Sequence, residues 1–366
     1  MASRLSEASV RGAGVLAPPG RLLIDLDAVV TNWRTLCDLA APAAIAGVVK
    51  ADAYGLGMDQ VAPALRRAGC SLFFVAGLDE GAALRRQLPD VEIAVLSAPV
   101  DGFQAIYRDY RLLPVLNHRG DLAAWPGDDA VLHIDTGMTR LGLDPAAVRA
   151  LERRRFRLVM SHLACADEPE HGLNEAQRCL FAELAARFDA PASLANSSGI
   201  FLGSGYRFDI ARPGMALYGL NPTPGLPSPM RPVLRLEARV LQIREADRPL
   251  TVGYGAEAEI RPGQRLATVA AGYADGYLRA ASPGAGALLH GRRVPLVGRV
   301  SMDTIVLDVT GLPPGSVEPG DWAVLIGEGM DADDLAEAAG TIGYEFLTSL
   351  GARYERTYTG GEGAGA

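Results

Sequence analysis

Lysine occurs once in this chain of 366 residues, at position 50, and every other basic residue among the 35 Lys plus Arg is an arginine. A guanidinium stays protonated and is no useful nucleophile, whereas a primary amine that loses its proton can form an imine with an aldehyde or ketone. Lys50 stands near the carboxyl end of the apolar run AIAGVVKA, which is typical of a buried parallel strand. Because buried lysines are rare without a partner or a task, the sequence favours imine chemistry over a lysine kept by chance on the surface.

Residues suited to anion binding follow several other apolar runs. Small residues, hydroxyl groups and exposed backbone N–H groups can cradle a phosphate, and they occur in NSSG at 196–199 and ARPG at 211–214. Tyr54, Arg140 and His162 add polar groups at further predicted strand ends. Taken alone, each has an ordinary explanation as a turn or a hydrogen-bonded polar residue. A reactive amine beside a phosphate cradle, however, points to pyridoxal phosphate.

Alternating strands and helices are predicted to position these residues. Segments of helical period separate eight short apolar runs between about residues 20 and 220: IAGVVKA, LFFVAG, EIAVLSA, LLPVLN, VLHIDTG, LVMSHLA, SLANSSG and DIARPG. Eight such units predict an α/β fold with an N-terminal (β/α)₈ TIM-type barrel, whose chemistry collects at the carboxyl ends of the strands. No GxGxxG motif follows the first strand, which argues against a dinucleotide-binding fold.

The pattern changes after the Pro-rich stretch 221–232, which reads as a domain linker. Beyond it the chain is rich in β-branched residues, with one late helix expected over 331–350 from an aspartate cap. We therefore expect a C-terminal, mostly-β domain. The predicted division is a mobile N-terminal segment at 1–18, the barrel at 19–232, the β-rich domain at 233–359 and a disordered tail at 360–366.

Composition narrows the function classes. A net charge of −8 and scattered arginines make nucleic acid an unfavourable partner. The four cysteines lack metal-ligand or CxxC spacing, so we expect reduced thiols and no metal site. No run of about 18 apolar residues occurs, and the first residues lack a continuous apolar core, which predicts a cytoplasmic protein without membrane contact.

Seven ordered motifs resemble those of bacterial alanine racemases, and the resemblance extends from about residue 20 to residue 358. They are VVKADAYGLG, HIDTGMTRLG, MSHLACADE, NSSGIF, DIARPGMALYG, AAGYADGY and VGRVSMD. The family consists of pyridoxal phosphate enzymes with a barrel and a β-rich domain. Seven motifs in order are far more specific than any one of them.

The resemblance implies a catalytic role for two residues. Lys50 would hold the cofactor as an aldimine and act as one base, and Tyr273 would be the other base. Tyr273 would reach into the barrel of a second subunit, so the active unit would be a homodimer with shared sites. Racemisation removes the α-proton from one face and returns it to the other, so two bases on opposite faces can divide the work.

The resemblance also implies binding roles at matching positions. Cofactor binding would fall to Tyr54, His162, Asn196, Ser197, Arg212, Gly214, Met215 and Tyr358, with Arg212 facing the pyridine nitrogen. The substrate carboxylate would be held by Arg140 and the backbone N–H of Met302, and Asp167 and Arg299 would line the entryway. An arginine donor leaves the pyridine nitrogen unprotonated, which disfavours transamination and decarboxylation.

Three positions depart from the usual motifs. Leu56 stands where many members have histidine, and Ser301 replaces a frequent cysteine; neither change removes a proposed catalytic group. His133 stands where many members carry a carbamylated lysine that helps to hold the residue matching Arg140. An imidazole cannot form that carbamate, so either His133 orients Arg140 in another way or it is a packed polar residue.

The function expected from these observations is interconversion of L-alanine and D-alanine, supplying D-alanine for peptidoglycan. A racemase of another small amino acid, or of a broader range, is the nearest alternative. A similarly folded decarboxylase is disfavoured by Arg212. A non-catalytic pyridoxal phosphate carrier would be a lone barrel, and the β-rich domain with Tyr273 argues against it.

Overall fold

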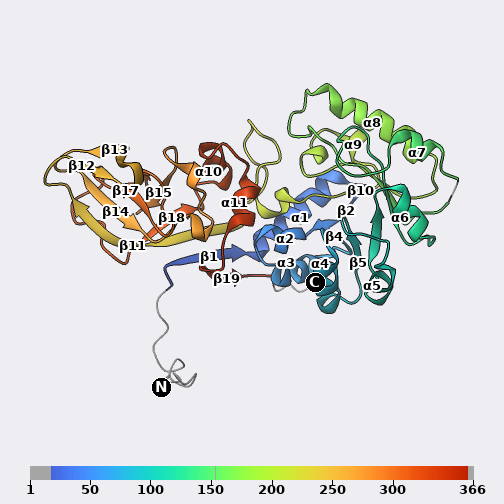
Figure 1. The fold of residues 1–366 in the computed structure, drawn as a ribbon, viewed down its shortest axis with the longest axis horizontal. Coiled ribbons are helices and arrows are strands. Elements are labelled where there is room, and N and C mark those ends of the chain that lie inside the picture. Colours follow the sequence, from blue (N-terminus) through green and yellow to red (C-terminus); the bar gives the residue numbers. More distant parts are fainter. Residues whose placement is uncertain (1–17, 153, 362–366) are drawn as a thin grey trace, which may run out of the picture.

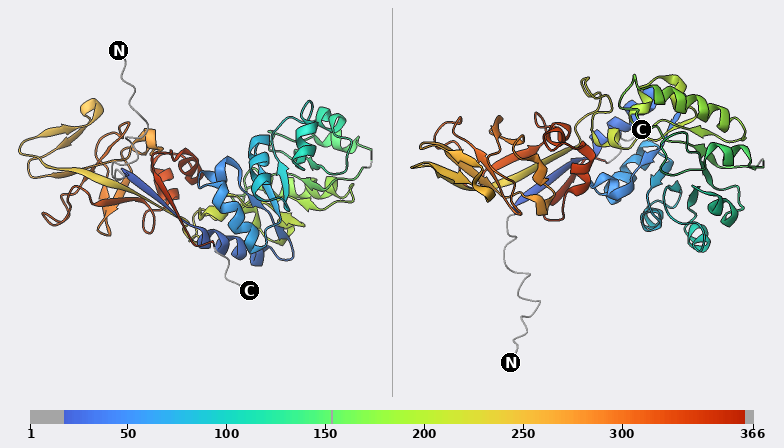
Figure 2. Two further views of the ribbon diagram at one scale, coloured as in Figure 1. Left: turned by 90° about the horizontal axis from the view of Figure 1, so that it is seen from below. Right: turned by 45° about the horizontal axis from the view of Figure 1, so that its top comes forward.

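The computed structural model describes residues 18–361 except residue 153. The predicted mobile segment 1–18 and the predicted tail 360–366 lie outside the described residues, apart from residue 18 and from Gly360 and Gly361. The described part has two domains that lie end to end, a barrel ringed by helices and a β-rich domain (Figures 1 and 2). The prediction of a (β/α)₈-type barrel followed by a mostly-β domain is confirmed.

Parallel strands form the barrel in chain order. Seven make one sheet: β3 (Gly47–Val48), β4 (Leu72–Val75), β5 (Glu92–Val95), β6 (Leu113–Leu116), β7 (Val131–His133), β8 (Leu158–Met160) and β9 (Ala192–Ser193). The short strand β2 (Ala44–Ile45) precedes β3 and pairs with β10 (Ile210–Ala211). The backbone N–H of Arg212 donates to the Ala195 carbonyl at 2.9 Å, and this hydrogen bond links the chain after β10 to the chain after β9. The ring is therefore closed.

Alternation along each strand divides the apolar side chains between two cores. Phe74, Val115 and Met160 belong to a cluster inside the barrel, whereas their neighbours Phe73 and Leu116 join the larger core that includes the helices. The α-helices of the described part of this half are α1 (Leu26–Ala40), the short α2 (Lys50–Tyr54), α3 (Met58–Ala68), α4 (Leu78–Gln87), α5 (Gln104–Asp109), α6 (Arg119–Ala124), α7 (Pro145–Arg149), α8 (Gly172–Ala185) and α9 (Ser204–Arg207). Because both faces of each strand are buried, the strands form a rigid scaffold for the loops that follow their carboxyl ends.

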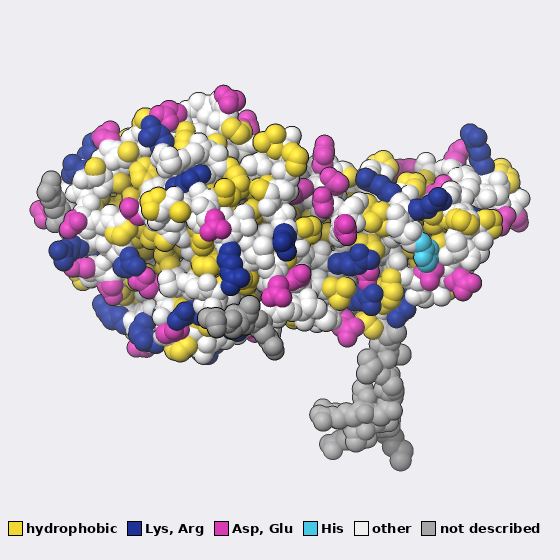
Figure 3. Space-filling model, turned by 180° about the vertical axis from the view of Figure 1, so that it is seen from behind, with side chains coloured by type: hydrophobic (Ala, Val, Ile, Leu, Met, Phe, Trp, Pro, Cys, Tyr) yellow, Lys and Arg dark blue, Asp and Glu magenta, His cyan; other side chains and the backbone are white. Residues whose placement is uncertain are grey.

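The β-rich domain is built on a long strand, β11 (Leu234–Glu245), which pairs with strands on both sides. The other strands are β12 (Leu250–Val252), β13 (Ala258–Ile260), β14 (Arg265–Val269), β15 (Gly286–Leu289), β16 (Arg292–Pro295), β17 (Ile305–Asp308), β18 (Trp322–Ile326) and β19 (Glu355–Thr359). On the face shown in Figure 3, acidic and basic side chains are interspersed over both domains. That face carries no broad patch of one sign.

The first described strand, β1 (Gly20–Asp25), belongs to the sheet of the β-rich domain. It pairs antiparallel with β11 and parallel with β19, although the predicted boundary assigns residues from 19 onward to the barrel. Asp25 then caps α1 by accepting the Ala28 N–H at 2.9 Å, and the chain enters the barrel. The sequence interpretation contains no element for β1 or α1. Hydrogen bonding thus joins the first described strand to the last described one.

Two helices replace the single late helix expected over 331–350. They are α10 (Ala332–Ala338) and α11 (Gly343–Ser349), with Gly340 between them at a φ of +67°. A residue at positive φ cannot continue a right-handed helix, so this glycine ends α10 and lets the chain turn. Asp331 occupies the N-cap position, but its side chain makes no capping hydrogen bond. The turn brings α11 against the barrel loop that follows Lys50.

Candidate active site

A cavity of about 870 Å³ opens at the carboxyl ends of the barrel strands and is lined by both domains. Ten predicted site residues line it: Lys50, Tyr54, Arg140, His162, Asp167, Asn196, Ser197, Arg212, Gly214 and Met215. They follow five different strands, β3, β7, β8, β9 and β10. Parallel strands bring their carboxyl ends together, which is why residues far apart in sequence meet here.

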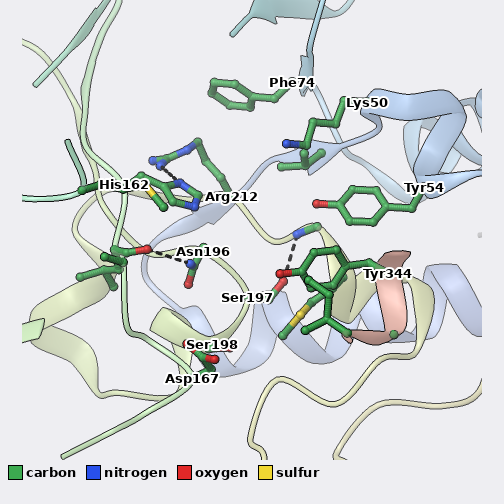
Figure 4. Close-up of a pocket in the computed structure, with 18 of the residues that line it drawn as sticks. Lys50, Tyr54, Phe74, His162, Asp167, Asn196, Ser197, Ser198, Arg212 and Tyr344 are labelled. Carbon is green, nitrogen blue, oxygen red and sulfur yellow. Dashed lines mark hydrogen bonds between the residues drawn. The ribbon is translucent and has the colours of Figure 1, made fainter. Parts of the chain in front are cut away.

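Lys50 lies two residues after the end of β3 and begins the short helical turn α2 (Lys50–Tyr54). It faces Arg212 and His162 across the cavity (Figure 4). Burial lowers the pKa of the Lys50 amine, and the positive charge of Arg140 lowers it further, while Glu80 acts in the opposite direction. The neutral, nucleophilic form of this amine is therefore easier to reach than for an exposed lysine.

Arg212 is a buried cation without an acidic partner among the described residues. It is 4 % exposed, and its guanidinium donates to the Ser193 hydroxyl and to the Ser161 carbonyl. A third contact, 3.4 Å long, runs to Nδ1 of His162. Because arginine can only donate, Nδ1 accepts and the neutral imidazole carries its proton on Nε2. Burial and the charges of Arg212 and Arg140 lower the pKa of His162, so the ring stays neutral.

Hydroxyl groups and backbone N–H groups gather at the other end of the cavity. The Ser197 hydroxyl accepts from the Gly214 N–H at 3.0 Å and the Ala216 N–H at 3.2 Å. The Tyr54 hydroxyl lies against Gly214, where a Cβ would come within 2.1 Å of it. Burial raises the pKa of Tyr54 to about 12, so Tyr54 remains a hydrogen-bond donor. Such a group of donors suits a phosphate.

We expect Gly214→Ala to weaken pyridoxal phosphate binding by about tenfold or more, the usual effect of overpacking a fixed site. The added methyl group would displace the Tyr54 hydroxyl, whose ring is held by stacking on Tyr218 at 4.8 Å. Titrating cofactor-free protein with pyridoxal phosphate and following visible absorbance measures the effect. Gly172→Ala is the matched control, because a Cβ there meets no atom within 4 Å. Equal affinities in the two variants would contradict the steric argument.

Tyr344 is a cavity residue that the sequence interpretation missed. It comes from α11 of the β-rich domain, and its ring lies 6.3 Å from that of Tyr54 at an angle of 72°. Tyr358, which was expected to bind the cofactor, is not among the described residues that line the cavity. It lies on β19 with its hydroxyl against Gly57, because that strand runs along the domain junction rather than over the cavity. Among the tyrosines of the β-rich domain, Tyr344 is thus the one that lines the cavity beside the hydrogen-bond donors around Ser197 and Tyr54.

Three other predicted residues also lie outside the described cavity lining: Tyr273, Met302 and Arg299. Tyr273 is 42 % exposed and Met302 is 51 % exposed. Backbone hydrogen bonds join their loops, since the Ala274 N–H donates to the Met302 carbonyl at 3.0 Å. Arg299 pairs with Glu257 through an Nε–Oε2 contact of 2.8 Å. Tyr273 and Met302 therefore form one exposed surface of the β-rich domain.

His133 ends β7 and lines the cavity with a fixed tautomer. Its Nδ1 lies 2.8 Å from Oδ1 of Asn117. The amide nitrogen of Asn117 already donates to the Leu96 and Val115 carbonyls, so Oδ1 accepts and Nδ1 of His133 carries the proton. Burial and the charges of Arg212 and Arg140 lower the pKa of His133 to about 3. The remaining ring nitrogen is therefore a neutral acceptor.

The donor set fits pyridoxal phosphate. An amine for the aldehyde lies between a phosphate cradle and a buried guanidinium that can donate to a ring nitrogen, and the cavity has room for a small ligand. Within residues 18–361, leaving out 153, no cluster of His, Cys, Asp and Glu side chains is arranged to hold a metal ion. The described helices are all too short or too polar to cross a membrane.

Comparison with known proteins assigns both halves of the chain. Residues 24–222 match the family model for the alanine racemase N-terminal domain, and residues 233–358 match that for the C-terminal domain. The chain is 49% identical to an alanine racemase of Rhodospirillum rubrum, over 94% of this chain and 97% of the relative. It is 47% identical to a catabolic alanine racemase of Mesorhizobium japonicum, over 93% of both chains.

A solved structure extends the likeness to three dimensions. The alanine racemase of Bartonella henselae, with covalently bound pyridoxal phosphate, superposes with a TM-score of 0.89 at 38% identity, over 94% of this chain and all of that chain. Sequence, domain order and fold agree over nearly the whole length. The chain therefore belongs to the alanine racemase family, whose members are pyridoxal phosphate-dependent amino-acid racemases.

Proposed function

We propose that this chain is a pyridoxal phosphate-dependent alanine racemase in which Lys50 and Tyr273 move the α-proton. The observation that carries the proposal is the joint placement of three groups in one cavity of a family member: a reactive amine, a phosphate cradle, and a buried guanidinium that has no carboxylate partner among the described residues. When bound, the cofactor supplies an electron-withdrawing ring that acidifies the α-C–H bond of an attached amino acid. All other parts of the reaction fall to residues of the chain.

Cofactor binding is proposed for the residues that face the cavity. Lys50 binds the aldehyde carbon, and Arg212 donates to the ring nitrogen with His162 beside it. Phosphate binding falls to Tyr54, Ser197, Tyr344 and the backbone N–H groups of Gly214 and Met215, with Asn196 shaping the loop. The buried charge of Arg212 supports this arrangement, because it has no carboxylate partner among the described residues.

Proton transfer is proposed to need two subunits. The lowered pKa of Lys50 supports its role as a base on one face of the substrate. Tyr273 is exposed on the β-rich domain and does not line the cavity of its own chain. A homodimer in which each Tyr273 and Met302 surface completes the cavity of the other subunit supplies the base for the second face. The exposure of both residues supports this reading.

Substrate binding is proposed to rest on Arg140 and on the backbone N–H of Met302 from the other subunit of the homodimer, which together suit a carboxylate. Asp167 lines the cavity and Arg299 lies with Tyr273 and Met302 in the β-rich domain, so both remain candidates for the entryway. The physiological role proposed is D-alanine supply for peptidoglycan in the cytoplasm. The gene is deleted in a strain that has no other alanine racemase. A requirement of this strain for added D-alanine would support the proposed role, and normal growth without D-alanine would refute it.

A direct assay tests the activity and its breadth. Purified protein loaded with pyridoxal phosphate is incubated with single L-amino acids, and formation of each D-isomer is followed by chiral chromatography. Conversion of alanine well above serine, lysine and arginine is the expected result. Comparable rates with bulky substrates would favour the broader racemase, and no conversion of any amino acid would favour a carrier protein.

His133→Leu is expected to raise the KM for alanine several-fold while pyridoxal phosphate affinity stays unchanged. The substitution removes the acceptor nitrogen that His133 contributes beside Arg140. Because the pKa of His133 lies near 3, its ring is neutral over the assay range, and the pH profile of the variant should match the wild type above about pH 5. Unchanged kinetics would leave the histidine a packing role, with Arg140 held by the Asp135 loop alone.

A further inference from the structure

Four consecutive residues after Lys50 have left-handed backbone geometry. The φ angles of Ala51, Asp52, Ala53 and Tyr54 are 52°, 53°, 54° and 56°. Residues with a Cβ avoid this region because the Cβ approaches the following carbonyl oxygen. A run of four non-glycine residues therefore persists only where surrounding contacts hold it.

Glu80 makes the contacts that hold the start of this turn. One carboxylate oxygen accepts the Ala51 N–H at 2.7 Å. The other accepts the Ala76 N–H at 2.6 Å and the Gly77 N–H at 3.4 Å, in the loop between β4 and α4. A single carboxylate thus joins two neighbouring barrel loops with charge-assisted hydrogen bonds. Asp52 closes the far side by accepting the Met58 N–H at 2.7 Å.

The turn separates two residues that act at different ends of the proposed cofactor. Lys50 begins it and Tyr54 ends it, and both side chains enter the cavity (Figure 4). The ring of Tyr54 is fixed against Tyr218, and its hydroxyl abuts Gly214. The distance between amine and phosphate cradle is therefore set by the shape of this turn, and relaxation to right-handed backbone would move Lys50 relative to Tyr54.

We propose that Glu80 is a positioning residue, which holds the left-handed turn and thereby sets the Lys50 amine at the correct place relative to the phosphate cradle. It touches no reacting atom and acts through the backbone of Ala51. The identity of the ligand rests on the proposed function, whereas the mechanical role of Glu80 does not.

Glu80→Gln tests the proposal with little change of volume. An amide has one acceptor oxygen and presents N–H groups on the other side, so it cannot accept from both loops. Amide exchange in the peptide covering residues 50–57 is expected to rise about tenfold or more, and pyridoxal phosphate affinity to fall by a similar factor, the usual effect of losing a hydrogen bond to a charged group. Asp144→Asn is the matched control, since Asp144 caps α7 at Ala147 and does not line the cavity.

Rescue distinguishes positioning from general destabilisation. Ala51 is exposed and at positive φ, so Ala51→Gly removes the strain without removing packing. Adding Ala51→Gly to Glu80→Gln should recover part of the lost cofactor affinity. Glu80→Asp keeps the charge but has a shorter side chain, so its amide exchange over residues 50–57 should resemble that of Glu80→Gln. Variants that melt below the assay temperature are measured after cooling to a temperature at which circular dichroism shows them folded.

The pH at which the visible band of the lysine-bound cofactor changes gives a second readout. Charged or titratable groups facing Lys50 are Arg140, Arg212, Glu80 and His162. Glu80 raises the pKa of Lys50, so its neutralisation should shift the midpoint to lower pH, and Asp144→Asn should not shift it. Wild-type exchange at 50–57 together with an unshifted midpoint in Glu80→Gln would overturn the proposal. Amide exchange over residues 50–57 is also measured on cofactor-free protein. This measurement does not depend on racemase activity, so it tests the role of Glu80 even where the protein fails to racemise alanine.

Discussion

Lys50→Arg is expected to lower kcat/KM for alanine by at least about 10⁴-fold, because the variant loses both the covalent attachment point and one catalytic base. Arginine keeps the positive charge at position 50 but cannot form an imine or accept a proton at neutral pH. The loss therefore reports amine chemistry rather than charge. Racemisation rate and the visible absorbance band of the bound cofactor are measured on the same sample, and both should disappear.

Borohydride reduction of the wild type gives the companion measurement. Because Lys50 is the sole lysine, the N-terminal amine is the one other primary amine in the chain. Peptide mapping after reduction should find the cofactor on the peptide that contains Lys50. An adduct on the N-terminal amine, or no adduct, would refute the assignment of Lys50, as would appreciable racemase activity in Lys50→Arg.

Tyr273→Phe is expected to lower racemisation in both directions by about 10²- to 10⁴-fold while cofactor affinity stays at the wild-type value. Tyr273 does not line the cavity of its own chain, so its hydroxyl is proposed to act on the second face of the substrate in the other subunit. Loss of α-deuterium from D-alanine should outlast loss from L-alanine in the variant, since Lys50 remains. Equal loss from both isomers would contradict this division. Tyr254→Phe is the matched control, as a 70 % exposed tyrosine of the same domain.

Mixing variants tests whether the sites are shared. A heterodimer of Tyr273→Phe and Lys50→Ala subunits contains one site with both bases and one with neither. Random exchange at equal amounts should therefore restore about a quarter of the wild-type activity, given two equivalent sites per symmetric dimer. Absence of recovery, with subunit exchange demonstrated by mass spectrometry, would mean that each chain supplies its own tyrosine.

The barrel and most of its site were accessible from sequence for a physical reason. Each parallel strand is an apolar run followed by polar or small residues, so strand ends can be located locally, and the fold brings those ends together. Lys50 and the segments NSSG and ARPG were found in this way, whereas the binding roles of Ser197 and Arg212 came from the family resemblance; all three residues line the cavity. The contact between His133 and Asn117 follows the same rule, since they lie at the ends of the neighbouring strands β6 and β7.

Features that depend on long-range docking left no local signal. Tyr344 lies in a segment of ordinary helical composition, and only the docking of α11 on the barrel brings it beside Tyr54. Glu80 lies in the third position of α4, where an acidic residue predicts a helix cap, and its second contact with Ala51 depends on how two loops meet. Strand β1 was missed because its partners lie far away in sequence. Pairing over such separations cannot be derived from periodicity.

The position of β1 in the sheet has a consequence for synthesis on the ribosome. It leaves the exit tunnel before the barrel and before both of its partner strands, and 216 residues separate Arg21 from its partner Glu237. The barrel strands, by contrast, pair with neighbours that emerge soon after one another. The nascent chain therefore holds β1 unpaired until β11 has emerged, and its second edge stays open until β19 has been made. Strand β19 covers that second edge, so termination of synthesis before β19 leaves β1 with an open edge that favours aggregation.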